Sequence, residues 1–258
     1  MELRLLSKQL LNILKRLINT TWRPLKREKG VNTMCMNVVE RIDDLVKVRH
    51  VLASVFDKKG LEAFIPELIR INPEIKIFST GGTYKKIKEI LGDKADTTLT
   101  QVSDYTGQPE TQGGLVKTLD FKIYLGLLTE TYNDAHNDDI QRTGSVHIDM
   151  TLCNLYPFKD TISKDGVTVE MARGNIDIGG PCMIRASAKN FIRVASVVDP
   201  SDYTAILSEM NANNGSISLG LRYRLAQKAF DHTAVYDRTI ADYLGSRTFD
   251  DVAACYNF

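Results

Sequence analysis

Short apolar runs alternate with helical patterns of apolar positions from residue 48 onward, and this alternation sets the expected fold. Buried strands are predicted by apolar, largely β-branched runs at 51–56, 75–79, 148–155 and 194–198. Helices are predicted by apolar positions at helical spacing at 61–71, 84–91, 168–173, 180–190, 201–211 and 219–244. This order predicts an α/β fold: a mostly parallel sheet flanked by helices, with additional C-terminal helices.

The first 35 residues follow a different pattern. Leucines and isoleucines recur at helical spacing from Leu3 to Leu17 with basic residues between them, which predicts a basic amphipathic helix. Three interpretations fit it: an organelle transit peptide, a membrane-surface helix, or a dispensable extension. We favour a dispensable extension at 1–35, followed by an α/β domain at 36–200 and a C-terminal helical part of that domain at 201–258.

Charge and composition exclude several classes of protein. Residues 1–35 carry eight Lys and Arg against two Glu, a net +6, whereas the rest carries 25 cations against 30 anions, a net −5. An acidic body disfavours nucleic-acid binding, and the absence of any apolar run of about eighteen residues argues against a membrane span. The four cysteines form no CxxC pair and the four histidines no HxxxH spacing, so we expect no metal site and a cytoplasmic protein.

Two short polar motifs follow predicted strands. Ser79–Thr83 places two glycines between a strand and a helix, where exposed backbone N–H groups can bind an anion. Ser54–Lys58 ends the neighbouring strand and offers a lysine at the start of the next helix. A Gly-Gly turn after a strand can also be plain loop closure, but the two motifs together favour a phosphate site.

Four further side chains could carry chemistry, and each has a simpler interpretation. Lys117 follows a glycine pair, although a lone surface lysine is usually solvated. Tyr156 stands just past the strand at 148–155, where it could also pack at the rim of the core. Asp177 lies between two isoleucines and needs a partner, and Lys189 ends a predicted helix, where a cation is common.

Seven motifs occur in one colinear order across about residues 49–244: Ser54–Lys58, Ser79–Thr83, Val116–Leu119, Asn154–Phe158, Ile176–Gly180, Ala188–Asn190 and Lys228–Ala234. Together they resemble the inosine monophosphate (IMP) cyclohydrolase domain of the bifunctional purine-biosynthesis enzymes. The family fold is similar to methylglyoxal synthase, a mostly parallel sheet flanked by helices. The bifunctional family continues into a formyltransferase domain, so the resemblance implies a cyclohydrolase alone or a fragment containing only that half.

The resemblance implies a hydrolase of the cyclic amidine class. It would close the ring of 5-formamidoimidazole-4-carboxamide ribonucleotide to give IMP and water, the last step of de novo purine biosynthesis, without metal or cofactor. Lys189 is the leading proton-transfer residue by resemblance, completed by Lys117, Tyr156 and Asp177, with the carboxylate holding one ammonium. The nucleotide is held in the family by residues matching Asp57, Lys58, Ser79, Thr80, Gly81, Gly82, Thr118, Asn154 and Ile178.

The resemblance also implies partners. The family forms homodimers with sites near the subunit boundary, and residues 219–244 are the expected contact helix. A separate formyltransferase is a second expected partner, whereas neither a nucleic acid nor a membrane is expected.

The chain departs from the family pattern at several positions. This chain has Leu115, Asp120, Phe121 and Tyr124 where the family usually has Arg, His, Pro and His, and Phe56 where Ser is common. These changes bear on substrate affinity.

The alternative function is a non-catalytic nucleotide-binding regulatory module of the same fold, which would need a phosphate site but no proton relay. Methylglyoxal synthase itself is disfavoured by the Ile-Asp-Ile-Gly-Gly segment and the extra C-terminal helices.

Overall fold

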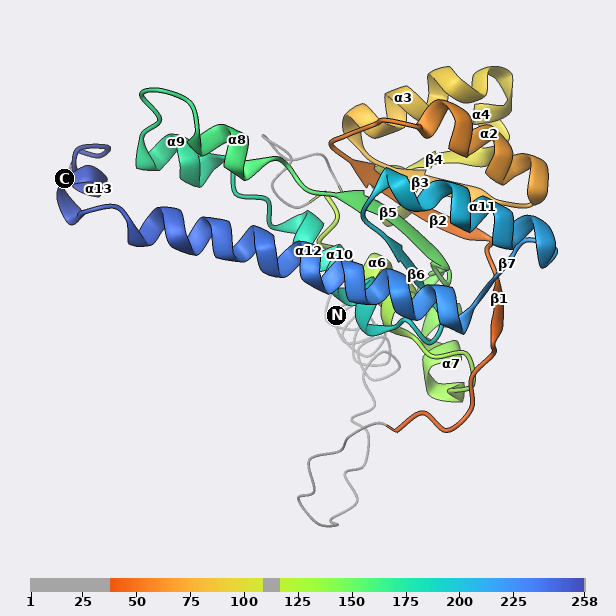
Figure 1. Ribbon diagram of the computed structural model, residues 1–258. Coiled ribbons are helices and arrows are strands. Elements are labelled where there is room, and N and C mark those ends of the chain that lie inside the picture. Colours follow the sequence, from red (N-terminus) through yellow and green to blue (C-terminus); the bar gives the residue numbers. More distant parts are fainter. Residues whose placement is uncertain (1–37, 109–116, 258) are drawn as a thin grey trace, which may run out of the picture. The chain divides into compact units, whose positions relative to one another are not determined.

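A five-stranded sheet in the order β4-β3-β2-β5-β6 organises residues 38–108 and 117–257, the part of the chain that the computed structural model describes (Figure 1). All neighbouring strands in it are parallel. The strands are β2 (His50–Val55), β3 (Lys76–Ser79), β4 (Leu99–Gln101), β5 (Met150–Asn154) and β6 (Ala195–Val197). The predicted α/β fold with a mostly parallel sheet is therefore confirmed.

Helices cover both faces of this sheet because both faces are apolar. Side chains that alternate along β2 show the division: Val51 and Ala53 belong to one buried cluster and Leu52 to the other. The first cluster is completed by α2 (Leu61–Ile71), α3 (Gly81–Leu91) and α11 (Tyr203–Ala212). The second is completed by α5 (Val102–Thr106), α6 (Phe121–Leu128) and α10 (Gly179–Lys189).

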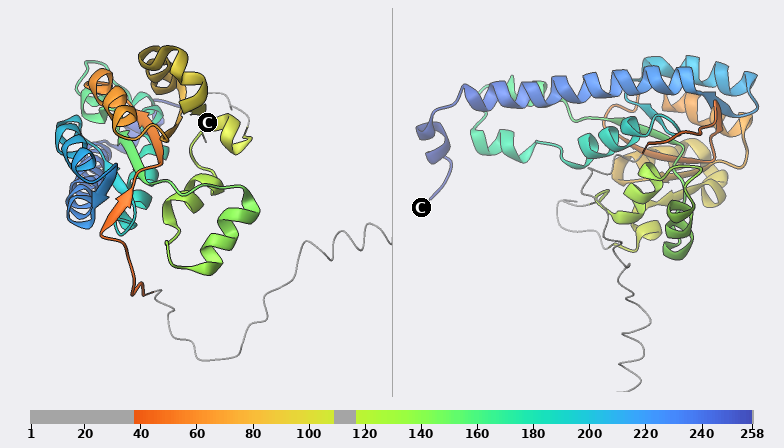
Figure 2. Two further views of the ribbon diagram at one scale, coloured as in Figure 1. Left: turned by 90° about the vertical axis from the view of Figure 1, so that its right-hand side faces the viewer. Right: turned by 90° about the horizontal axis from the view of Figure 1, so that it is seen from below.

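The 27-residue helix α12 (Leu219–Gly245) contacts β6 and α10 and contributes to both clusters (Figure 2). Its C-terminal half continues past the sheet toward the C-terminus (Figure 1). The remaining elements are η1 (Gly92–Lys94), α4 (Ala95–Thr98), α7 (Asp134–Thr143), α8 (Phe158–Ile162), α9 (Val169–Gly174), η3 (Pro200–Asp202) and α13 (Phe249–Ala253). None of the helices within residues 38–108 and 117–257 combines the length and apolar character that a membrane span requires.

A second, two-stranded antiparallel sheet joins β1 (Leu45–Lys47) to β7 (Ser216–Ser218). Arg222 of α12 is 1% exposed and anchors this region. Its guanidinium donates hydrogen bonds to the backbone carbonyls of Asp43, Asp44, Phe191, Ile192 and Ile217. A buried guanidinium is tolerated only when its donors are satisfied, so these carbonyls tie residues 43–47 to the C-terminal helices.

Most predicted elements agree with the structure, with small differences at their ends. The helix predicted at 61–71 has those bounds, and the helix predicted at 219–244 ends one residue later. The helix predicted at 84–91 begins earlier, at Gly81, because its first turn uses the glycine pair. The predicted basic helix at 1–35 lies outside the described residues.

Candidate active site

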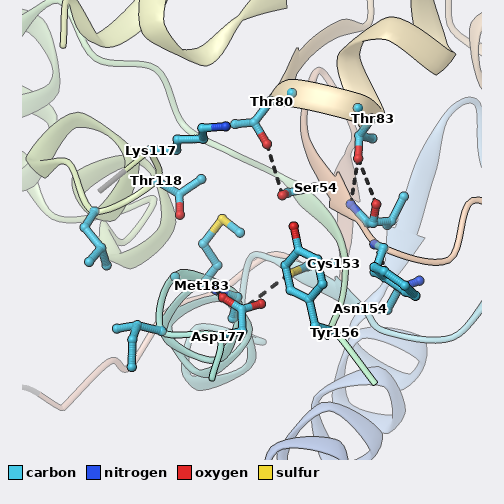
Figure 3. A pocket seen from close by; sticks show the side chains of 18 of the residues that line it. Ser54, Thr80, Thr83, Lys117, Thr118, Cys153, Asn154, Tyr156, Asp177 and Met183 are labelled. Atoms are coloured by element: carbon cyan, nitrogen blue, oxygen red, sulfur yellow. Dashed lines mark hydrogen bonds between the residues drawn. The ribbon is translucent and has the colours of Figure 1, made fainter. Parts of the chain in front are cut away.

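The carboxyl ends of β2, β3 and β5 meet at one edge of the sheet, where they border a cavity of about 590 Å³ (Figure 3). The remaining walls come from the start of α3, residues 117–119, and the segment from residue 174 through the first residues of α10. This is the edge at which parallel α/β sheets bind ligands. Ten of the thirteen predicted site residues line it: Lys58, Thr80, Gly81, Gly82, Lys117, Thr118, Asn154, Tyr156, Asp177 and Ile178.

One end of the cavity is built to hold an anion. Gly81 opens α3 with a φ of 48°, which is accessible to glycine but strained for other residues. The Lys117 ammonium lies 3.7 Å from the point that a β-carbon on Gly81 would occupy, and the Lys58 ammonium lies 3.9 Å from the equivalent point on Gly82. Two cations therefore converge on a helix N-terminus, whose free N–H groups and dipole also attract negative charge.

Hydroxyl groups fix this end to the sheet. The Ser54 and Thr80 hydroxyls are 3.1 Å apart, and both line the cavity. Thr83 of α3 is buried, and its hydroxyl accepts a hydrogen bond from the Val55 N–H and donates one to the Val55 carbonyl. This double contact sets the position of the α3 N-terminus against the end of β2.

Asn154 holds the loop between β2 and α2. Its Oδ1 accepts hydrogen bonds from the N–H groups of Phe56 (2.7 Å) and Asp57 (3.0 Å), and its Nδ2 donates to the Asp57 carbonyl (2.9 Å). The carboxamide is therefore engaged by the protein, although the residue lines the cavity. Asn154 acts on the site by placing the loop that carries Lys58.

Asp177 lies across the cavity from Thr80 and Lys117 (Figure 3). Its carboxylate accepts a hydrogen bond of 3.0 Å from the Gly180 N–H, and its own N–H donates to the Tyr236 hydroxyl at 2.7 Å. Burial raises the pKa of Asp177, and the hydrogen bonds from the α10 N-terminus oppose that rise. Within the described residues its hydrogen-bond partners are N–H groups of α10, and the expectation that this carboxylate also holds a lysine ammonium stays a prediction.

Tyr156, Thr118 and Ile178 also line the cavity. Tyr156 stands on the turn after β5, is 56% exposed, and extends its hydroxyl into the cavity (Figure 3). Thr118 is buried, and its hydroxyl oxygen lies 2.7 Å from the point that a β-carbon on Gly179 would occupy. Ile178 is 57% exposed at the start of α10 and offers an apolar surface.

Three predicted site residues do not line the cavity. Ser79 is fully buried and donates its hydroxyl hydrogen bond to the Ala53 carbonyl, so it joins β2 and β3. Asp57 accepts a hydrogen bond from the Lys59 N–H and stabilises its own loop. Lys189 is exposed in the last turn of α10, ten residues beyond Gly179, which corresponds to about 15 Å along the helix axis.

Several lining residues were not singled out as site residues: Ser54, Phe56, Thr83, Cys153, Asn175 and Met183 are among them. Ser54, Phe56 and Thr83 belong to the two strand-end motifs, so their position could have been inferred. Cys153 is buried, and burial, with a smaller effect of the nearby Asp177, raises the pKa of its thiol far above the ordinary value, so a thiolate nucleophile is disfavoured.

Two of the departures from the family pattern have local explanations. Asp120 caps α6 by accepting a hydrogen bond of 2.7 Å from the Lys122 N–H, which accounts for an acid at this buried position. The Tyr124 ring lies in the core beside Cys182, and burial raises the pKa of its phenol. Leu115 lies outside the described residues. Within 38–108 and 117–257, no three His, Cys, Asp or Glu residues are grouped to hold a metal ion.

Comparison with known families matches two models to consecutive parts of the chain. Residues 60–182 match the MGS-like domain, and residues 187–257 match the AICARFT/IMPCHase bienzyme family. The first match contains the Gly81-Gly82 start of α3 and Asp177, and the second contains Lys189 and α12. The resemblance inferred from the seven motifs is thereby confirmed.

Curated relatives include two proteins described as bifunctional purine biosynthesis protein PurH. The protein of Ruminiclostridium cellulolyticum is 46% identical over 197 residues, and that of Neisseria gonorrhoeae is 45% identical over 205 residues. These alignments cover 76% and 80% of this chain but 37% and 38% of the relatives, so the chain spans little more than a third of their length. A crystal structure titled ForH superposes with a TM-score of 0.62 at 29% identity, covering 76% of this chain and 97% of that one.

Proposed function

Because the chain contains an MGS-like domain followed by sequence of the AICARFT/IMPCHase bienzyme family, we propose that it is an IMP cyclohydrolase. The proposed substrate is 5-formamidoimidazole-4-carboxamide ribonucleotide, and the products are IMP and water. The observation that carries the proposal is that one cavity combines an anion-binding end with Lys117, Tyr156 and Asp177. A regulatory nucleotide-binding module would need the first feature without the second, and the PurH relatives do not favour it.

The nucleotide phosphate would bind at the start of α3. Lys58 approaches the Gly82 backbone there, and the Ser54 and Thr80 hydroxyls add donors. A dianionic phosphate at a helix N-terminus beside an ammonium group is favourable. With the phosphate fixed, the base would extend toward Tyr156 and Asp177.

The reaction joins two parts of one substrate, so orientation supplies much of the acceleration. The carboxamide nitrogen attacks the formyl carbon, the nitrogen loses a proton, and the formyl oxygen gains one. The C–O bond then breaks, and water leaves with a second proton that comes from the formamide nitrogen. These steps need groups that exchange protons near neutral pH.

Three side chains in the cavity suit those proton transfers. The raised pKa of the Asp177 carboxyl brings it closer to the pH at which it can both accept and release a proton. The Tyr156 hydroxyl extends into the cavity and can pass a proton. The Lys117 ammonium can stabilise negative charge that develops on the formyl oxygen.

Lys189 fits this scheme only through a second copy of the chain. Its exposed position at the far end of α10 keeps it from the cavity of its own protomer. We propose a homodimer with α12 as a contact helix, in which Lys189 of one protomer approaches the cavity of the other as a proton-transfer residue. The exposure of Lys189 supports this arrangement, because no residue in 38–108 or 117–257 of its own protomer forms a hydrogen bond or ion pair with its ammonium.

The location and the further partner follow from the reaction. The formyl group of the substrate must be added by a formyltransferase, so we propose that such an enzyme supplies the substrate in the cytoplasm. The extension at 1–35 precedes every motif of the site, and we propose that ring closure does not need it.

The function is tested by adding the formamido ribonucleotide to the purified protein and following IMP by absorbance. Turnover that depends on Lys117 is expected. Tight binding of the nucleotide without turnover would favour the regulatory module instead.

A further inference from the structure

Phe56 and Tyr156 form an aromatic pair at the mouth of the cavity. Their ring centroids are 5.1 Å apart and their planes are inclined by 55°. Both rings are open to solvent, since Phe56 is 47% and Tyr156 is 56% exposed. Tilted pairs at this separation attract each other beyond the burial of their surfaces, so each ring limits the rotation of the other.

The backbone that carries the Phe56 ring is itself fixed. The Phe56 N–H donates to Asn154 Oδ1 at 2.7 Å, and the Phe56 carbonyl accepts from the Lys58 ammonium at 3.1 Å. Asn154 lies two residues before Tyr156 on the same segment. The β2–α2 loop and the end of β5 are therefore joined twice, by the Asn154 carboxamide and by the contact between the two rings, and only the ring contact depends on the Phe56 side chain.

The Tyr156 hydroxyl has no partner that fixes its direction within residues 38–108 and 117–257. It projects into the cavity across from Lys117 (Figure 3). A half-exposed tyrosine without such a partner would sample several rotamers, and only some of them place the oxygen in the cavity. The contact with Phe56 selects among these rotamers.

We propose that Phe56 is a positioning residue that holds the Tyr156 phenol in the orientation used for proton transfer. The proposal rests on the cyclohydrolase function proposed above. It predicts that Phe56 acts on the turnover rate through Tyr156, whereas nucleotide binding depends on Lys58 and the start of α3.

The kinetic test compares Phe56→Leu and Phe56→Tyr in the wild-type and Tyr156→Phe backgrounds. We expect Phe56→Leu to lower kcat about two- to tenfold, the range that corresponds to one aromatic pair, with KM unchanged. Phe56→Tyr should retain kcat because it keeps the ring. In the Tyr156→Phe background, Phe56→Leu should lower kcat no further, since the hydroxyl that it positions is gone. Phe249→Leu, a change at another exposed ring far along the chain, should leave kcat unchanged.

An equal loss from Phe56→Leu in both backgrounds, or a loss in Phe56→Tyr as large as in Phe56→Leu, would overturn the proposal. So would an effect confined to KM. Circular dichroism and Tm of each variant verify that the comparison is made between folded proteins.

A second readout does not require turnover. Protein labelled with 3-fluorotyrosine gives a ¹⁹F resonance for residue 156, assigned by its loss in Tyr156→Phe. We expect Phe56→Leu to move this resonance toward the position of free fluorotyrosine and Phe56→Tyr to leave it near its wild-type position. A resonance that Phe56→Leu leaves unmoved overturns the positioning role. If the wild-type protein shows no turnover while the resonance moves as expected, the cyclohydrolase function fails and the ring contact stands.

Discussion

The Asp177 carboxylate accepts a hydrogen bond of 3.0 Å from the Gly180 N–H and thereby caps α10 from inside the cavity. A β-carbon on Gly180 would meet the Asp177 carboxylate and would lie 2.7 Å from the Leu155 side chain, so the acid and the helix approach each other closely. Burial favours the neutral acid, whereas the helix N-terminus favours the carboxylate, and burial has the larger effect on the pKa of Asp177.

Replacing Asp177 by Asn should separate stability from activity. Because the folded pKa lies above the ordinary value of about 3.9, the ionised carboxylate costs folding free energy at neutral pH. We expect Asp177→Asn to raise the free energy of unfolding at pH 7 by up to about 1 kcal/mol and to lower kcat.

The gain in the free energy of unfolding from Asp177→Asn should depend on pH. Below about pH 4 the acid is protonated in both states, so the gain from Asp177→Asn should disappear there and grow as pH rises through the folded pKa. Urea unfolding at several pH values measures it, with Asp165→Asn at an exposed position as the control. A gain that is largest at low pH would contradict this account.

Lys58 should act on phosphate binding. We expect Lys58→Met to weaken the binding of ribose 5-phosphate about tenfold or more, since it removes a charge-assisted contact, and to raise KM with a smaller effect on kcat. The neighbouring Lys59 is exposed and does not line the cavity, so Lys59→Met is the matched control. Calorimetric titration with ribose 5-phosphate checks the result, and equal losses in both variants would show that only the net charge of the loop matters.

Complementation between inactive variants tests the proposed role of Lys189. We expect Lys189→Ala to lower kcat by about 10²–10⁴, as for loss of a proton-transfer group. If the residue acts in the partner's cavity, mixing and reassociating Lys189→Ala with Lys117→Met should restore activity, because one hybrid site then contains both lysines. A mixture no more active than its components would show that Lys189 does not complete a second protomer's site, and near-normal kcat in Lys189→Ala would remove it from catalysis.

Two truncations test the N-terminal boundary. Deleting 1–35 should leave kcat and Tm unchanged, whereas deleting 1–47 removes β1 and two carbonyl acceptors of buried Arg222. The longer deletion should lower the free energy of unfolding by on the order of 3 kcal/mol, because guanidinium donors lose their partners. A loss of stability already present in the shorter deletion would extend the folded unit into residues 1–35.

The sequence predicted the central strands and long helices because the spacing of their apolar residues indicates which of their faces are buried. Strands β2 and β5 are buried on both faces, and α2 shows one continuous apolar face. The pair β1 and β7 went unrecognised because three-residue strands are too short for an alternating pattern. The short helices α4 to α7 were also missed. In α7 the reason is that most of its residues are polar and that its first residue is determined by the Asn133 cap.

The site was predicted at the level of motifs and less well at the level of side-chain roles. Glycines and lysines at strand ends could be placed because parallel strands end at one edge. The role of Ser79 could not be predicted, because its hydroxyl donates a hydrogen bond to the Ala53 carbonyl inside the sheet. The contact of the Asp177 carboxylate with the Gly180 N–H could not be predicted either, since the order of residues does not reveal that this carboxylate faces the start of α10.

The most direct measurement is the initial rate of IMP formation from 5-formamidoimidazole-4-carboxamide ribonucleotide by the wild-type protein and by Lys117→Met, both verified as folded. The account predicts a wild-type rate well above the spontaneous one and a rate for Lys117→Met at least about 100-fold lower at saturating substrate. A wild-type rate equal to the spontaneous one, or equal saturating rates for the two proteins, would contradict it.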